Sequence, residues 1–97
     1  MKTIYKYQLK ADKKQYVPLP KDSQILAVQV QKGDVCLWAL VDTHNHVEER
    51  CIEIYGTGHP IDNDGMERKY ISTFQLDGGS LIYHAFEYTG FVLKSSK

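Results

Sequence analysis

The sequence carries no excess charge of either sign, few cysteines and prolines, and no long apolar run. Its 12 basic residues balance 12 acidic ones, which argues against the strongly basic face that duplex-DNA binders need. No stretch approaches the roughly 20 apolar residues of a membrane-spanning helix, and the first residues show no apolar signal segment. We therefore expect an intracellular protein with neither a duplex nucleic acid nor a membrane as partner.

The basic residues are nonetheless unevenly spread, because the first quarter of the chain is rich in lysine. A locally basic surface is one reading, and lysines that keep sheet edges soluble are the more ordinary one. The six lysines concerned are Lys2, Lys6, Lys10, Lys13, Lys14 and Lys21.

The sequence has little that would support a metal site or catalysis. Cys36 and Cys51 fit no thiolate zinc pattern and are expected to be buried free thiols in a reducing cytosol. His44 and His46 fall in a polar loop, where solvated side chains are the usual case, and residues 62–65 lack the glutamate that completes a calcium loop. No serine or cysteine can be linked to a base, so we expect no cofactor, no metal and no enzyme.

Helical periodicity is absent, whereas apolar alternation with β-branched and aromatic residues recurs at short intervals. Residues 15–19 are expected to pair back on the preceding strand as a short edge strand limited by two prolines. The run 35–42 is apolar on both faces, so it is expected to be central and covered on both sides. The expected strands are 3–9, 15–19, 24–31, 35–42, 50–55, 70–76 and 81–88, with a last apolar run at 91–93.

Within these strands the alternation indicates which side chains face inward. Leu26, Val28 and Val30 are predicted to share one apolar face, and Ile52 and Ile54 to face the core. About seven short strands separated by turns predict an all-β fold, a small antiparallel β-sandwich or a partly open barrel, with the sandwich slightly favoured. One domain would span residues 1–97, with a frayed tail from about residue 94.

The segment with the most unusual chemistry is residues 55–62, Tyr-Gly-Thr-Gly-His-Pro-Ile-Asp, between two expected strands. Two glycines one residue apart would let backbone N–H groups form a concave nest for phosphate or carboxylate. It is neither a dinucleotide fingerprint nor a P-loop, because no third glycine, helix or Gly-Lys-Ser/Thr follows. The alternative is a β-bulge and a long turn directed by Pro60. The candidate ligand-binding residues are Tyr55, Gly56, Thr57, Gly58, His59 and Asp62, with Arg50, Arg68 and Lys69 flanking them as phosphate-neutralising cations.

Two further features have a structural and a functional reading. His84 lies mid-strand and is interpreted as a half-buried histidine whose polar atoms have partners. The seven tyrosines include several on expected strands, where they are ordinary β-formers or line a groove or subunit interface.

The runs 24–31, 36–42, 56–61, 70–75 and 78–87, with Gly-Thr-Gly-His-Pro-Ile as the most specific element, resemble a family of short phage and prophage proteins. That family is a domain of unknown function, so the resemblance carries over no catalytic residue. It implies a viral protein in the cytoplasm of a bacterial host. The leading expectation is a homo-oligomeric counter-defence protein that sequesters a nucleotide-derived immune messenger. The alternatives are a module that inhibits a host defence protein through a sheet edge or tyrosine-rich face, and a minor virion protein.

Overall fold

The computed structural model of the chain describes residues 1–11 and 13–92, with no side-chain detail at residues 91 and 92. The predicted frayed tail from about residue 94 lies outside the described residues. The described part contains a single 3-10 turn, Asp77–Gly79, and seven strands: β1 (Lys2–Gln8), β2 (Gln15–Pro20), β3 (Gln24–Gln31), β4 (Asp34–Asp42), β5 (Val47–Gly56), β6 (Met66–Leu76) and β7 (Leu81–Val92).

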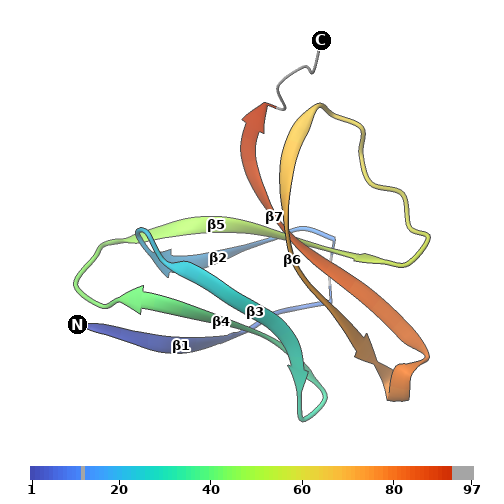
Figure 1. Cartoon of the computed structure of the whole chain (residues 1–97), viewed down its shortest axis with the longest axis horizontal. Helices are drawn as coiled ribbons and strands as arrows, with labels where there is room; N and C mark the ends of the chain where they lie inside the picture. Colours follow the sequence, from blue (N-terminus) through green and yellow to red (C-terminus); the bar gives the residue numbers. More distant parts are fainter. Residues whose placement is uncertain (12, 93–97) are drawn as a thin grey trace.

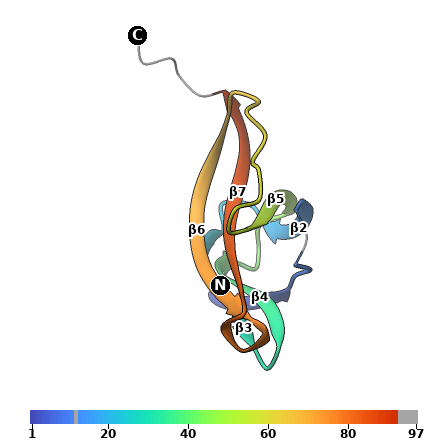
Figure 2. The same ribbon diagram turned by 90° about the vertical axis from the view of Figure 1, so that its right-hand side faces the viewer.

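The strands form two antiparallel sheets packed face to face (Figures 1 and 2). One sheet has three strands in the order β1-β4-β3, and the other has four in the order β2-β5-β7-β6. The sheets do not close into a barrel, so the predicted antiparallel sandwich is confirmed. The β6–β7 hairpin is long. Its open end, where β6 begins and β7 finishes, reaches beyond the three-stranded sheet (Figure 2).

The core lies between the sheets and is built from alternate residues of both. Its largest fully buried side chains are Leu19, Val28, Leu37, Val41 and Ile52. The predicted central position of residues 35–42 is confirmed, since β4 pairs with both β1 and β3. Coverage on both sides is only partial, because Trp38 and Leu40 on its outer face are half-buried.

The predicted partner of residues 15–19 is wrong. β2 pairs antiparallel with β5 in the opposite sheet rather than with β1. It is an edge strand as expected, and this placement buries Val17 and Leu19 against the core. Strands β5 and β6 also begin earlier than predicted, at Val47 and Met66.

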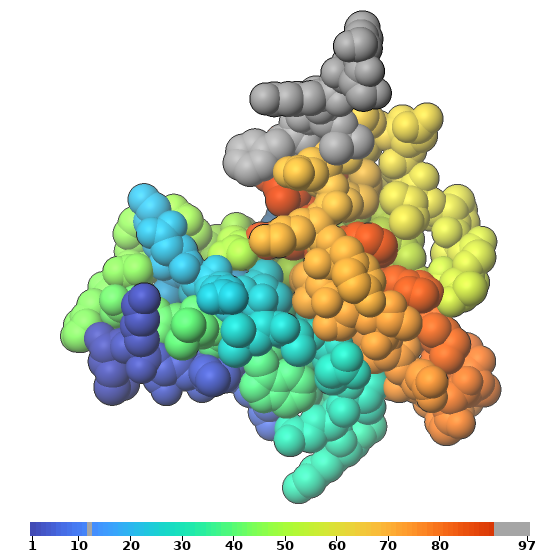
Figure 3. All heavy atoms as spheres, viewed as in Figure 1, coloured from blue at the N-terminus to red at the C-terminus, as the bar shows by residue number. Residues whose placement is uncertain are grey.

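A β-bulge in β3 overturns the predicted apolar face of that strand. The register with β4 shifts between Ile25 and Ala27, so Leu26 is 44% exposed while Val28 is fully buried. A similar shift in β6 precedes Ser72, whose Oγ accepts a hydrogen bond from the Val28 N–H at 3.0 Å. Strands β3 and β6 therefore lie side by side and hold the two sheets together along one side of the sandwich (Figure 3).

Candidate functional site

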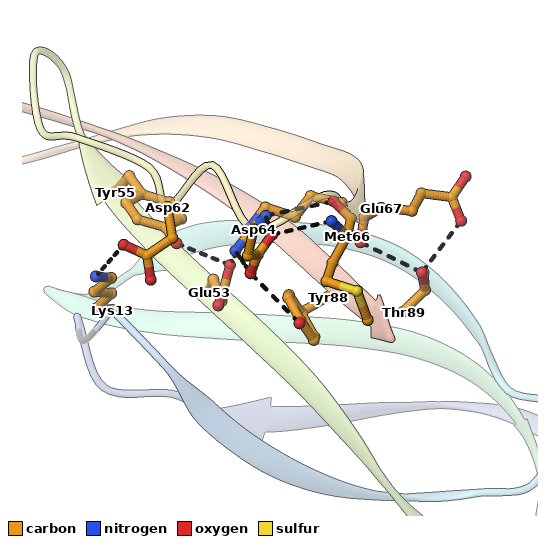
Figure 4. Close-up of polar contacts among 10 residues, drawn as sticks. Lys13, Glu53, Tyr55, Asp62, Asp64, Met66, Glu67, Tyr88 and Thr89 are labelled. Carbon is orange, nitrogen blue, oxygen red and sulfur yellow. Dashed lines mark hydrogen bonds and ion pairs between the residues drawn. The ribbon is translucent and has the colours of Figure 1, made fainter. Parts of the chain in front are cut away.

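The predicted site lies on a long connection, residues 57–65, between the end of β5 and the start of β6. Ile52 and Ile54 of β5 face the core, so Glu53 and Tyr55, one residue out of phase, face the outer side of the four-stranded sheet. The connection runs over that outer side (Figure 4), which leaves Glu53 and Tyr55 only 4% and 3% exposed.

The first turn of the connection is closed by its own histidine. The Gly56 N–H donates to His59 Nδ1 at 3.1 Å, and the His59 N–H donates to the Gly56 carbonyl at 3.0 Å. A Cβ at position 56 would lie 2.7 Å from His59 Cε1, so the imidazole occupies the space that a side chain would need. Gly58 has φ of 87°, in the left-handed region. The two glycines therefore serve different purposes, close approach at 56 and backbone conformation at 58.

Thr57 joins this turn to β7 and β6 through His84. The Thr57 N–H donates to the Ile82 carbonyl at 3.0 Å, and Thr57 Oγ1 lies 2.8 Å from His84 Nε2. The other ring nitrogen, Nδ1, lies 3.0 Å from Thr73 Oγ1. The interpretation of His84 as a half-buried histidine with both ring nitrogens partnered is confirmed.

These contacts bear directly on the predicted anion nest. The N–H groups of Gly56, Thr57 and His59 all donate to acceptors within the chain. An anion held by these three groups would have to displace those hydrogen bonds. Ligand binding by the loop stays a prediction. In the observed conformation, these three N–H groups donate hydrogen bonds within the chain.

The most polar part of the site is a group that we call the Arg68 cluster: Glu53, Tyr55, Asp64, Arg68 and Tyr88. Arg68 Nε donates to Glu53 Oε1 at 2.6 Å, and its two terminal nitrogens each lie 3.0 Å from a carboxylate oxygen of Asp64. The Tyr55 hydroxyl donates to the same Glu53 oxygen at 2.9 Å, and the guanidinium lies 4.9 Å from the centre of the Tyr88 ring. The cluster fastens the connection to the sheet (Figure 4).

The electrostatics of the cluster are those of a satisfied network. Hydrogen bonds from Arg68 hold the pKa of Asp64 down to about 2. Burial, reinforced by the bond to Glu53, raises the pKa of Tyr55 to about 12. The pKa of Arg68 is raised, mainly by its bonds to Asp64. Among the described residues, no buried side-chain nitrogen or oxygen is without a partner, so this guanidinium is neutralised before any ligand arrives.

Of the remaining predicted residues, Arg50 and Lys69 lie on strands outside the connection, whereas Asp62 lies within it. Arg50 is on the inner face of the sheet, where it pairs with Glu87 through both its Nε and a terminal nitrogen and donates to the Ser23 carbonyl at 2.9 Å. It lies six residues from Gly56 along one strand, or about 20 Å. Lys69 is exposed beside Glu87, and Asp62 is exposed with a 3.5 Å ion pair to Lys13.

Sequence reasoning missed Glu53 and Asp64, the two carboxylates that hold Arg68. The sequence did contain a sign that Glu53 is paired, because it is a single charge inside the apolar run Cys-Ile-Glu-Ile-Tyr. A charge at such a position is buried in a two-sided strand only with a partner of opposite sign. Nothing local to Asp64 distinguishes it from an exposed turn residue.

The described residues contain no group of three or more side chains placed to hold a metal ion. No helix within them is long and apolar enough to cross a membrane. Both cysteines are buried and free, as predicted.

A family model described as a domain of unknown function (DUF7352) matches residues 1–92. The chain belongs to this family. The comparisons with curated proteins and with solved structures return no match. The membership confirms the resemblance to a domain of unknown function, and the description of DUF7352 names no catalytic activity.

Proposed function

We propose that this DUF7352 protein is a non-catalytic interaction module that pairs an extended segment of another protein with the free edge of β1. The observation that carries the proposal is the character of that edge. In the described part of the chain β1 pairs only with β4, leaving its other side open over seven residues. Ile4 and Tyr5 are 57% and 43% exposed there. An open edge supplies main-chain hydrogen bonds to an added strand.

The edge of the other sheet on the same side is built differently. β2 contains Pro18 and Pro20, which have no N–H to donate and which protect edge strands from pairing. β1 contains no proline. The contrast favours β1 as the recognition edge.

The charges along β1 favour a partner other than a second copy. Lys2, Ile4 and Lys6 alternate on the outer face of the sheet. Antiparallel pairing of two copies about Ile4 would set Lys2 against Lys6, and like charges directly opposite each other destabilise a sheet. A segment that alternates acidic and apolar residues would instead place carboxylates opposite both lysines.

The family resemblance supports a phage-encoded accessory protein that acts in the host cytoplasm by occupying a strand of a host defence protein. We give this precedence over sequestration of a nucleotide messenger at the glycine loop. The cavity beside that loop, lined by Gly56, Thr57, His59 and residues 80–83, has about 210 Å³, below the roughly 300–1,000 Å³ of typical ligand pockets.

Titration of the ¹⁵N-labelled protein with a short peptide alternating glutamate and valine tests the proposal, with a lysine–valine peptide as control. We expect chemical-shift changes concentrated at the β1 amides for the acidic peptide alone. Ile4→Lys should abolish them, whereas Val47→Lys, at an equally exposed position on β5, should not. Shifts elsewhere, or equal binding of both peptides, would contradict the proposal. A dimer in light scattering that Ile4→Lys dissociates would assign the edge to a second copy.

A further inference from the structure

The backbone of β1 presents every second residue to its open side. In an antiparallel pair, residues that exchange both backbone hydrogen bonds with the partner alternate with residues whose N–H and C=O point the other way. The Leu9 N–H donates to the Val35 carbonyl at 2.8 Å, and the Thr43 N–H donates to the Met1 carbonyl at 2.9 Å. Both contacts continue the register of β1 and β4, so the odd-numbered residues of β1 bond to β4. The N–H and C=O groups that point to the open side are those of Lys2, Ile4, Lys6 and Gln8.

The same rule explains where the prolines of β2 lie. The Ile54 N–H donates to the Lys13 carbonyl at 3.2 Å, and the Lys21 N–H donates to the His46 carbonyl at 2.7 Å. Both contacts continue the register of β2 and β5, so the odd-numbered residues of β2 bond to β5. The last two outward positions of β2 are prolines, which have no N–H: Pro18 and Pro20. A further strand would therefore find N–H donors along the whole of β1 but only at the start of β2.

The inner face of β1 is accessible from the side of the sandwich. Strand β3 packs against β6, whereas within the described residues β1 makes little contact with the four-stranded sheet. Tyr5 and Tyr7 face the space between the sheets, because the β4 residues opposite them are fully buried. Tyr5 is nevertheless 43% exposed, and its ring lies edge-on to that of Tyr7 with 6.4 Å between the ring centres. Apolar surface that faces inward on β1 is therefore still open to a partner.

A groove of about 690 Å³ lies at this opening, where β1 ends and β2 begins. Its floor consists of three residues that face the space between the sheets: Tyr7, Leu9 and Val17. Leu9 and Val17 belong to the core and are 6% and 5% exposed. The rim is polar and carries side chains from β1, from β2 and from the connection between them. We call it the side groove, and it joins the open edge of β1 to the margin of the core.

We propose that the side groove is the specificity site of this edge and takes an aliphatic side chain of the segment that pairs with β1. The inference rests on the proposed pairing of a partner strand with β1. Side chains alternate between the two faces of a strand, so a residue opposite Tyr7 would point into the groove while its neighbour lies beside Lys6 on the outer face. An aliphatic side chain suits the floor, because contact with Tyr7 and Val17 removes apolar surface from water. Backbone pairing then supplies affinity, and the groove selects the side chain.

Two peptides of equal length and charge separate occupation of the groove from backbone pairing: one alternates glutamate and valine, the other glutamate and threonine. Threonine is β-branched and favours strands as valine does, but it carries a hydroxyl in place of one methyl group. We expect the valine peptide to bind at least about tenfold more tightly, because a hydroxyl buried against the apolar floor would lack a partner. Equal affinity of the two peptides would overturn the role of the groove and leave the pairing with β1 intact. Binding of neither peptide would refute the pairing, and the inference with it.

Nuclear Overhauser contacts between the unlabelled valine peptide and ¹³C-labelled protein locate the side chains directly. We expect the valine methyl groups to contact the Tyr7 ring and the Val17 methyl groups, and the glutamates to contact Lys6. Valine contacts with Ile4 and Leu40, on the outer face of the sheet, would mean that the faces are reversed and would overturn the proposal. A dimer that excess peptide does not dissociate would overturn it as well, in favour of a second copy at this edge.

Tyr5→Thr removes the exposed ring beside Tyr7 and keeps a residue that favours strands. It should weaken binding of the valine peptide at least about threefold, because less apolar surface is covered, and should affect the threonine peptide less. Tyr70→Thr makes the same change on β6, where the side chain is 57% exposed, and should leave both affinities unchanged. Both side chains are exposed, so melting temperatures should stay near that of the parent protein. An equal loss in the two variants would overturn the assignment.

Discussion

Replacement of Arg68 by methionine is the sharpest test of how the connection over the four-stranded sheet is held. Methionine keeps most of the length of the arginine side chain and removes its charge. Glu53, 4% exposed, would then be a buried carboxylate without its cation. Removing one partner of a buried ion pair costs about 3–5 kcal/mol, a large share of the roughly 5–15 kcal/mol by which a domain of this kind is stable. We therefore expect the free energy of unfolding to fall by about 3–5 kcal/mol.

Urea unfolding followed by circular dichroism measures this loss, and two further variants identify its cause. Glu53→Leu added to Arg68→Met removes the unpaired carboxylate, so the double variant should be more stable than Arg68→Met alone. Arg50→Met is the matched control on the inner face, where the side chains of Arg50 and Glu87 are 24% and 13% exposed. Because water reaches that pair more easily, its loss should cost less, about 1–3 kcal/mol.

A loss below about 1 kcal/mol for Arg68→Met would refute the reasoning, since it would mean that Glu53 is readily hydrated or protonated at little cost. The reasoning would fail equally if the double variant were less stable than the single one. In that case the packing of the two side chains, rather than their charges, would hold the connection in place.

Three further outcomes follow from the same site. The pKa of Asp64 is lowered to about 2, so the stability that its carboxylate contributes is complete above the usual aspartate pKa and is lost as the pH falls toward 2. Asp64→Asn should therefore weaken the pH dependence of the urea midpoint over that interval. An unchanged pH dependence would contradict this. The pKa of Tyr55 is raised to about 12, so stability should fall as the pH rises from about 10, where an unfolded tyrosine ionises, toward 12. Tyr55→Phe should remove that fall, which urea midpoints at each pH measure. An ultraviolet titration of this variant should lack the phenol that ionises last. Gly56→Ala should lower the free energy of unfolding by about 1 kcal/mol, because the added Cβ displaces the His59 ring and breaks its hydrogen bond. In a His59→Ala background the same substitution should have almost no effect. An equal loss in both backgrounds would mean that the strain lies in the backbone.

Alternation within one segment was sufficient to predict the seven strands and the inward face of β5, whereas the predicted inward face of β3 was wrong at Leu26. Pairing was harder: β2 joins β5 rather than β1, a choice made by the burial of Leu19 and Val17 against the opposite sheet. The bulge that exposes Leu26 depends on contact with β6, far along the chain. Local patterns carry no information about either.

The separation of Arg50 from the predicted site could have been read from the sequence. Arg50 has the same parity as Ile52 and Ile54, which were predicted to face the core, whereas Tyr55 has the opposite parity. The two residues therefore belong to opposite faces of one strand. The closure of the turn by His59 could not have been read in this way, because it depends on the orientation of one ring over Gly56.

The two sides of the sandwich differ in how they are closed, and this difference supports the proposed binding at β1. On one side Ser72 of β6 accepts a hydrogen bond from the backbone of β3, and these two edge strands are in contact. Part of the outer face of the four-stranded sheet is covered by residues 57–65 and the Arg68 cluster. The opposite side holds the open edge of β1. The N–H groups of Gly56, Thr57 and His59 are bonded within the chain, which supports our proposal that a partner binds at the open edge of β1 instead. Ile4→Lys probes this edge directly, because a lysine there would face the added strand without a change on any other strand.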